Sequence, residues 1–143
     1  MIRKYAPEDK EAVLRVWHES AQIAYPFWAP QMFDRERQAV AEQFLPSAET
    51  YVFERMGKIV GFISLLGTEI GGLFVTPRFH REGIGSALMD EARGSRDHLE
   101  LDVFEANVIG RAFYEGYGFR VVGERVDDHT GLRVLRLELR RER

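Results

Sequence analysis

The sequence has no cysteine, only five prolines in 143 residues, and no long apolar run. Without cysteine, thiol nucleophiles, thiolate metal ligands and disulfide bonds are all excluded. The longest apolar stretch, Ile59 to Leu66, is far shorter than the roughly 18 residues of a membrane-spanning helix. The charged N-terminal segment also lacks the apolar region of a signal peptide. We therefore expect a cytoplasmic protein with no membrane contact.

An excess of one charge and segments of biased composition are missing as well. The formal net charge is only -3, so the chain lacks the clustered lysine and arginine with which nucleic-acid binders contact phosphates. Hydrophobic residues make up 45% of the chain and aromatic residues 12%, which suits a packed core rather than disorder. No repeat or flexible linker divides the sequence. We expect one domain over residues 1–143 and no nucleic-acid partner.

Apolar spacing and turn residues predict alternating strands and helices. The run from Ile59 to Ile63 is apolar on both faces, which is typical of a central strand covered on each side, whereas residues 135–140 alternate between leucine and charged residues. Strands are predicted at about 2–5, 51–53, 59–63, 70–75, 99–103, 119–126 and 132–139. Helices are predicted up to about residue 24, and at about 31–45, 83–94 and 107–117. The order is strand, two helices, three strands, helix, strand, helix, two strands.

The most informative stretch runs from Leu73 to Ser86, where a predicted strand passes through a short loop into a helix. Gly83 and Gly85 let the backbone approach a ligand closely. The first N–H groups of a helix lack internal partners, and the helix dipole favours an anion beside them. Arg78 and Arg81 add positive charge nearby. This pattern indicates either a phosphate site or a tight turn with close packing of helix against sheet.

Other phosphate, metal and hydrolase motifs fail on particular residues. A dinucleotide-binding fingerprint needs a third glycine where Leu88 stands, and the Gly-Lys-Ser/Thr of a P-loop is absent. His18 and Glu19 begin a zinc-binding helix pattern, but Gln22 occupies the position of its second histidine. No Gly-x-Ser-x-Gly sequence marks a nucleophilic serine. We therefore predict no metal site and keep the phosphate site.

With these motifs in place, the chain strongly resembles the GNAT superfamily of N-acetyltransferases, which use acetyl-coenzyme A. The resemblance extends over the whole length. It rests on motifs in the family's order: the hairpin with Gly57 and Gly61, the strand end Leu73-Phe74-Val75-x-Pro77, the glycine-containing loop, and Phe113-Tyr114-Glu115-x-x-Gly118-Phe119. The loop departs from the family at its first position, where His80 replaces the usual glutamine or arginine.

The resemblance implies both a fold and an activity. The fold is a single α+β domain with a mixed, mostly antiparallel sheet of about seven strands and about four helices on its faces. The activity is transfer of an acetyl group from acetyl-coenzyme A to a primary amine of a small molecule or peptide by direct attack, because no cysteine is available to carry the acetyl group. The alternative is a non-catalytic acyl-coenzyme A binding or sensing module on the same fold. The oligomeric state stays open, with a homodimer as one possibility.

The resemblance also implies which residues hold the cofactor. Backbone groups of Phe74 and Val75 would pair with the pantetheine arm where two parallel strands separate. Asn107 would bond the pantetheine, cap the following helix, or do both. The pyrophosphate would lie on the loop and first helical turn formed by Arg81, Glu82, Gly83, Ile84, Gly85 and Ser86.

Two residues are candidates for catalysis. Tyr114 matches the tyrosine that many family members direct at the departing sulfur, where it would stabilise the developing thiolate by a hydrogen bond. Its alternative role is core packing. An amine with a pKa of about 10.4 is uncharged in roughly one molecule in 2,500 at pH 7, so a base is useful. Glu69 stands where some family members place that base, and its alternative role is that of a solvated glutamate at a strand end.

The acceptor site is expected outside the cofactor core. The break between the first two helices carries Tyr25, Phe27 and Trp28, which either line an acceptor pocket or pack beneath a helix corner. A turn at residues 127–130 contains Asp127 and Asp128, which either attract a cationic amine or are simply solvated.

Overall fold

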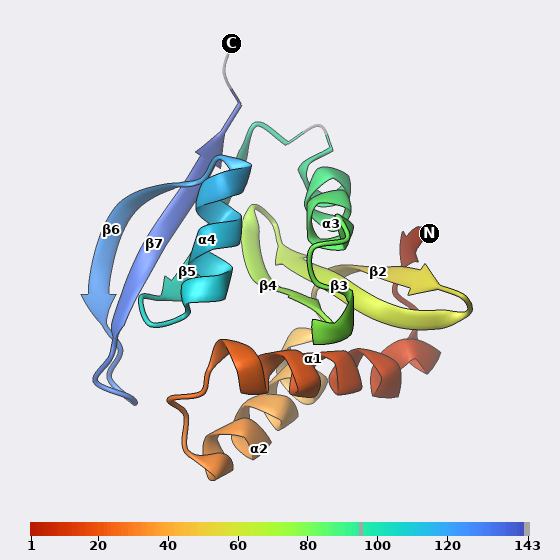
Figure 1. Cartoon of the computed structure of the whole chain (residues 1–143), viewed down its shortest axis with the longest axis horizontal. Coiled ribbons are helices and arrows are strands. Elements are labelled where there is room, and N and C mark those ends of the chain that lie inside the picture. The colour runs from red at the N-terminus through yellow and green to blue at the C-terminus, as the bar shows by residue number, and fades with distance from the viewer. Residues whose placement is uncertain (95, 142–143) are drawn as a thin grey trace.

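The computed structural model describes residues 1–94 and 96–141, and its elements follow the predicted order (Figure 1). The strands are β1 (Ile2–Lys4), β2 (Glu49–Arg55), β3 (Lys58–Leu66), β4 (Glu69–Val75), β5 (His98–Phe104), β6 (Arg120–Val126) and β7 (Arg133–Arg140). The helices are α1 (Lys10–Ala24), α2 (Pro30–Ala39), α3 (Ile84–Arg93) and α4 (Val108–Tyr117). Helix α2 continues into a π-helical turn, η2 (Val40–Phe44), so the predicted helix over 31–45 is confirmed in two parts. Short 3-10 turns lie at Pro7–Asp9 and Pro77–Phe79.

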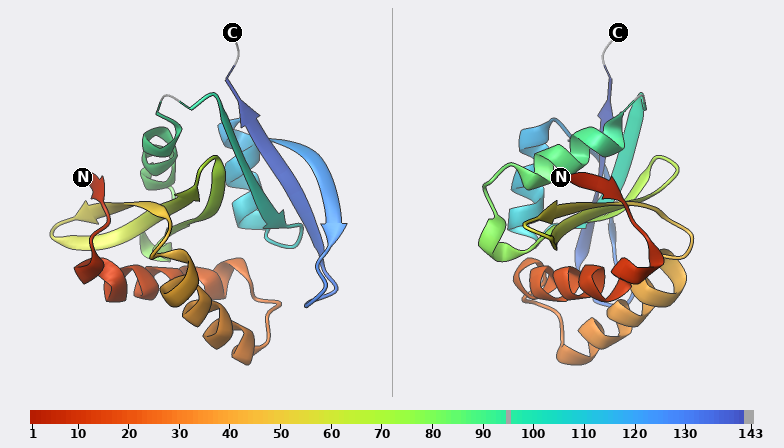
Figure 2. Two further views of the ribbon diagram at one scale, coloured as in Figure 1. Left: turned by 180° about the vertical axis from the view of Figure 1, so that it is seen from behind. Right: turned by 90° about the vertical axis from the view of Figure 1, so that its right-hand side faces the viewer.

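The strands form one sheet in the order β1-β2-β3-β4-β5-β7-β6. Every neighbouring pair is antiparallel except β4 and β5, which confirms the predicted mixed, mostly antiparallel sheet. The parallel pair is joined at a single register position, Glu69 opposite Glu100. Beyond it the two strands diverge toward their carboxyl ends. Figure 2 shows that β1–β4 run at a large angle to β5, β7 and β6.

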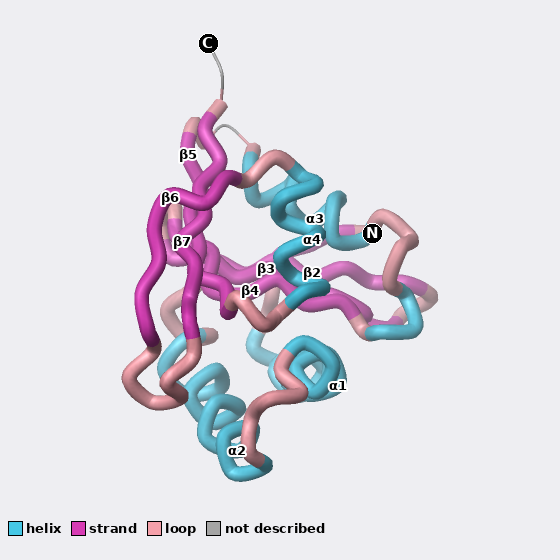
Figure 3. The backbone as a smooth tube through the Cα atoms, turned by 60° about the vertical axis from the view of Figure 1, so that its left-hand side comes forward, coloured by secondary structure: helices cyan, strands magenta, loops and turns pink. Residues whose placement is uncertain are grey.

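Helices cover both faces of the sheet and enclose two cores. On one face, α3 and α4 bury a cluster that includes Ile63, Leu88 and Leu137. On the other face, α1 and α2 cover a cluster that includes Val13 and Phe62 (Figure 3). Because β3 lies between the two cores, every residue from Ile59 to Leu65 is buried, as the continuous apolar pattern predicts.

Helix α1 is amphipathic and spans 15 residues. It buries Val13, Val16 and Trp17 against the sheet, while Arg15 and Glu19 remain partly exposed on its outer side. Within the described ranges, no helix combines the length and apolar character that crossing a bilayer requires.

Candidate active site

A cavity of about 610 Å³ opens between the first turn of α3 and helix α4. We call it the α3–α4 cavity. Its walls come from the end of β4, the predicted phosphate loop that follows β4, and one side of α4, which lies farther along the chain. The lining residues are Leu73, Val75, Phe79, His80, Arg81, Gly83, Ile84, Gly85, Ser86, Val108, Ile109, Gly110, Ala112, Phe113 and Tyr114.

The loop before α3 has the geometry of an anion site. Arg81 has a φ of 67° and Gly83 a φ of 82°, so the chain adopts the left-handed conformation at both residues immediately before the helix begins. The N–H groups of the first helical turn have no partner within the helix, and the helix dipole adds positive potential beside them. A phosphate group fits this arrangement.

Gly85 keeps the cavity open beside the loop. A Cβ atom at this position would lie 3.2 Å from Cε1 of Phe113, which is tighter than ordinary packing. Both residues line the α3–α4 cavity, so a larger side chain at position 85 would fill the space between the two helices.

His80, the departure from the family pattern, has a defined place. Its Nε2 atom lies 2.9 Å from the carbonyl oxygen of Val75. Because a carbonyl oxygen only accepts, Nε2 must carry the hydrogen. The imidazole thus ties the loop to the end of β4. The hydroxyl oxygen of Ser20 lies 3.0 Å from the same carbonyl and 2.7 Å from the carbonyl oxygen of Val16, so its single hydrogen is shared between α1 and the end of β4.

A second, smaller cavity of about 100 Å³ lies where β4 and β5 diverge, and we call it the splay cavity. Asn107 and Tyr25 line it, together with residues of β4 and β5. It adjoins the α3–α4 cavity. The residues shared by both are Leu73, Val75, His80, Ile109, Gly110 and Tyr114.

A third cavity of about 420 Å³ lies on the opposite face of β4, beneath α1 and α2. We call it the α1–α2 cavity. It shares Tyr25, Gly71, Gly72 and Phe74 with the splay cavity but no lining residue with the α3–α4 cavity. The three cavities therefore adjoin in a row across the sheet, with the splay cavity in the middle.

Tyr114 lies at the junction of the first two cavities. Its side chain is almost fully buried, and its ring packs edge to face on Phe113 and Phe119 at centroid distances of 5.5 and 5.6 Å. Burial raises the pKa of Tyr114, and the nearby Tyr25 adds to the effect. The phenol therefore keeps its proton at neutral pH and can donate a hydrogen bond.

The other predicted cofactor residues fall into two groups. Val75, Arg81, Gly83, Ile84, Gly85 and Ser86 line the α3–α4 cavity. Phe74 does not, because its side chain lies on the opposite face and lines the splay and α1–α2 cavities. Glu82 lines none of the three, and its carboxylate is paired with Arg55. Only the backbone of Phe74 and Glu82 remains available for the roles predicted for them.

Asn107 caps α4, as one of its two predicted roles requires. Its side-chain oxygen accepts a hydrogen bond from the backbone N–H of Gly110 at 3.0 Å. The residue is buried and lines the splay cavity. A contact between Asn107 and pantetheine stays a prediction.

Glu69 is not brought to the cavities that Tyr114 lines. It stands six residues before Val75, about 20 Å along an extended strand at about 3.3 Å per residue. Both its oxygens accept from the Arg136 guanidinium, at 2.8 and 2.6 Å, and Arg136 also binds Glu100 and Asp102. The geometry supports a structural ion-pair network at this position instead of the predicted base.

Replacing Glu69 by glutamine is therefore expected to leave acetyl transfer within about threefold of the wild-type rate, because a true general base contributes about a hundredfold or more. Steady-state thiol release with a saturating amine measures the effect. A fall of a hundredfold, with the cofactor still bound, would restore Glu69 as the base.

The aromatic break between α1 and α2 forms one wall of the α1–α2 cavity. Tyr25 stacks on Trp28 at a centroid distance of 4.2 Å, and both line the cavity. Phe27 does not line it but packs behind, against Tyr25 and Phe104. Burial, together with the charge of Glu36, raises the pKa of Tyr25 to about 12. The predicted pocket thus retains Tyr25 and Trp28, while Phe27 contacts Tyr25 from outside the cavity lining.

Several residues of the site escaped prediction. Glu36 and Met32 come from α2, Phe104 from the end of β5, and Val108 from the start of α4. None belongs to a local motif. Of these residues, only Phe104 could have been predicted from the sequence, because it ends the strand that was expected to diverge from β4. From the 127–130 turn, Asp127 and His129 line the α1–α2 cavity.

Comparison with known proteins agrees with this geometry. Residues 10–140 match the family described as "Acetyltransferase (GNAT) domain". The chain is 33% identical over 133 residues to the peptidyl-lysine N-acetyltransferase YiaC of Escherichia coli (strain K12), covering 92% of this chain and 91% of YiaC. The solution structure of apo-form YjaB from Escherichia coli superposes with a TM-score of 0.85 at 28% identity, covering 96% of this chain and 95% of YjaB.

A more distant relative shows the same fold. The N-acetyltransferase PaiA of Thermoplasma acidophilum, solved in complex with coenzyme A, superposes with a TM-score of 0.82 at 20% identity and covers 99% of this chain and 98% of its own. The family match spans most of the chain, and the element order, the diverging β4 and β5, and the loop before α3 all accord with it. The chain belongs to the GNAT family of acetyltransferases.

Proposed function

We propose that the protein transfers the acetyl group of acetyl-coenzyme A to a primary amine by direct attack of the amine. The observation that carries this proposal is the row of three adjoining cavities with Tyr114 in the wall of the middle one. A cofactor entering from the α3 side and an amine entering from the α2 side would meet there. No residue needs to carry the acetyl group between them.

The loop before α3 would hold the diphosphate through the backbone N–H groups of residues 83–86. The pantetheine arm would run along the end of β4, toward the splay cavity. Coenzyme A bound to PaiA and acetyl-coenzyme A bound to a putative streptothricin acetyltransferase from Bacillus anthracis are consistent with this choice of cofactor.

Acetyl-coenzyme A supplies an activated acetyl group: the neutral amine nitrogen forms a bond to the acetyl carbon, and the carbon–sulfur bond breaks to release coenzyme A as a thiolate. The proton that the nitrogen loses passes to solvent water, from which the released thiolate takes up a proton. The Tyr114 hydroxyl would donate a hydrogen bond to the departing sulfur. Because reference pKa values are about 10 for tyrosine and about 8.5 for a thiol, complete proton transfer from tyrosine to thiolate is already unfavourable. Burial of Tyr114 makes it more so. Tyr114 therefore acts as a hydrogen-bond donor.

The acceptor is a primary amine, and the name of the relative YiaC makes a lysine side chain the first to test. The alternative of an acyl-coenzyme A sensor lacks an explanation for the α1–α2 cavity, which adjoins the splay cavity on the face opposite the cofactor.

Acetyl-coenzyme A at 100 times its dissociation constant is expected to stabilise the folded protein by about 2.7 kcal/mol. Thermal unfolding with and without the cofactor measures this effect. Thiol release on adding a panel of amines, including lysine peptides, then measures transfer. Stabilisation without thiol release would favour the sensor, whereas no stabilisation would remove both functions.

A further inference from the structure

We propose that Glu36 makes the protein selective for acceptors that carry a second positive charge, separated by an apolar stem from the amine that reacts. This inference rests on the proposed function and names the substrate class of the same site. It concerns the α1–α2 cavity, through which the acceptor would approach.

Glu36 is the carboxylate in this cavity that is free to bind a cation. It projects from α2 and is partly buried, and among the described residues its carboxylate has neither a hydrogen-bond nor an ion-pair partner. The other carboxylate of the cavity, Asp127, already accepts from the backbone N–H and the hydroxyl of Thr130, at 3.0 and 2.8 Å. No lysine or arginine of the described chain lines the cavity, and His129 is the basic side chain there, on the 127–130 turn with Asp127. A cationic ligand group therefore meets an unneutralised negative charge there.

The position of Glu36 separates its charge from the reacting nitrogen. Glu36 lines the α1–α2 cavity but not the splay cavity, whereas Tyr25 lines both and stands between them. A carboxylate beside the attacking amine would favour its protonated form, which cannot attack. The Glu36 carboxylate is placed instead to bind a charge at the other end of the acceptor, where it orients the molecule without holding the reacting amine as an ammonium ion.

The walls between these two positions suit an apolar stem. Tyr25, Trp28 and Phe74 contribute aromatic surface to the α1–α2 cavity, and Phe104 lies against the first two rings. Methylene groups pack on such rings, and an ammonium group is attracted to their faces. Carboxylate and aromatic surface together define a ligand with a cationic end and a hydrocarbon stem.

The test compares two probes of the same length that differ by one charge, 1,5-diaminopentane and 1-aminopentane. Both tryptophans of the chain, Trp17 and Trp28, line the α1–α2 cavity, so their fluorescence reports directly on its occupation. Each amine is titrated into the full-length protein with and without coenzyme A, which has no acetyl group to transfer. Wild-type protein is expected to bind the diamine at least about tenfold more tightly, or about 1.4 kcal/mol.

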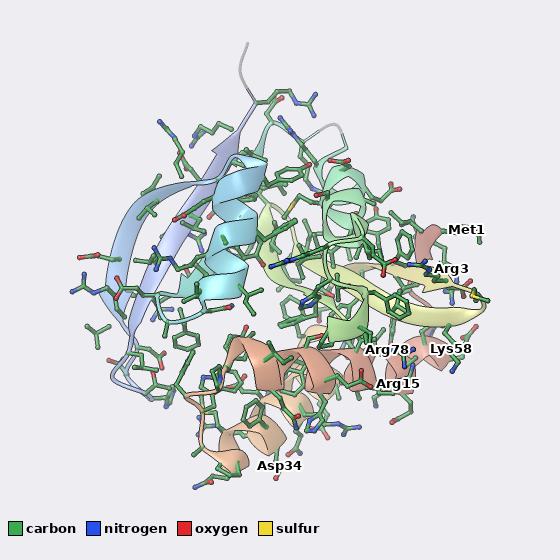
Figure 4. The ribbon with its side chains drawn as sticks, viewed as in Figure 1. Met1, Arg3, Arg15, Asp34, Lys58 and Arg78 are labelled. Carbon is green, nitrogen blue, oxygen red and sulfur yellow. The ribbon has the colours of Figure 1, made fainter. Side chains whose placement is uncertain are left out.

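Glu36→Gln is expected to reduce this preference to less than about threefold, because the second ammonium group of the diamine loses its ion pair. Asp34→Asn is the matched control: Asp34 lies on the same helix, is exposed, and lines none of the three cavities (Figure 4). It loses the same charge and should keep the full preference for the diamine.

Equal binding of the two probes by wild-type protein would overturn the inference. An equal loss of the preference for the diamine in the Glu36→Gln and Asp34→Asn variants would also overturn it, because that result would indicate only a long-range effect of net charge. Failure of the proposed function has a different signature. A Glu36-dependent preference for the diamine with no thiol release from acetyl-coenzyme A would leave the inference standing and remove acetyl transfer.

Discussion

Replacing Gly85 by leucine is expected to weaken acetyl-coenzyme A binding at least about a hundredfold, or about 2.7 kcal/mol. A Cβ atom alone would lie 3.2 Å from the Phe113 ring, so the longer side chain must enter the α3–α4 cavity or displace α4. It would occupy the space beside the N–H groups proposed to hold the diphosphate. Isothermal titration with acetyl-coenzyme A measures the loss.

Two further variants show whether the effect is specific to the cavity. Gly85→Ala adds only the Cβ atom, whose neighbour is the edge of a ring that can shift, so its effect should be small. Gly116→Leu introduces the same leucine in α4, where a Cβ atom meets nothing within 4 Å and the residue is exposed. It should bind the cofactor normally. Wild-type affinity in a folded Gly85→Leu protein would contradict the assignment of the loop.

Replacing Tyr114 by phenylalanine is expected to slow turnover at least about tenfold, or about 1.4 kcal/mol, with little change in cofactor affinity. Phenylalanine keeps the ring that packs on Phe113 and Phe119 and removes only the hydroxyl. A slower turnover would therefore reflect loss of the proposed hydrogen bond to the departing sulfur rather than an effect on folding. Thiol release at saturating amine gives kcat, and titration gives the cofactor affinity.

Tyr117→Phe is the matched control. Tyr117 lies on the same helix, but its hydroxyl bonds the Asp90 carboxylate and the residue lines none of the three cavities. Its turnover should match that of the wild type. If Tyr114→Phe and Tyr117→Phe turn over equally fast, the Tyr114 hydroxyl has no part in transfer.

Local patterns were sufficient to predict the order of strands and helices, whereas the arrangement of the sheet was implied by the resemblance to the GNAT superfamily. The run from Ile59 to Ile63 is apolar on both faces because β3 is covered on each side, and the alternation at residues 135–140 reflects a strand with one buried face. Helix α4 begins and ends as its Asn107 and Gly118 indicate. The π-helical turn after Ala39 was missed, since nothing in its sequence distinguishes it from the end of an ordinary α-helix.

The site could be predicted from the sequence only where its functional groups lie within one continuous segment. The loop from Arg81 to Ser86 could be predicted from two glycines before a helix, and the role predicted for it depends on backbone groups rather than on side chains. The ion pair of Glu69 with Arg136 could not be predicted, because the two residues are 67 positions apart in the chain. The role proposed for Glu36 could not be predicted from the sequence for the same reason, because it depends on side chains that are remote in the chain.

A crystal structure of the protein with coenzyme A is the most direct test of the central claim. The diphosphate is expected on the backbone N–H groups at the start of α3, with the sulfur in the splay cavity within hydrogen-bonding distance of the Tyr114 hydroxyl. A nucleotide bound away from α3, or a sulfur directed away from Tyr114, would contradict it.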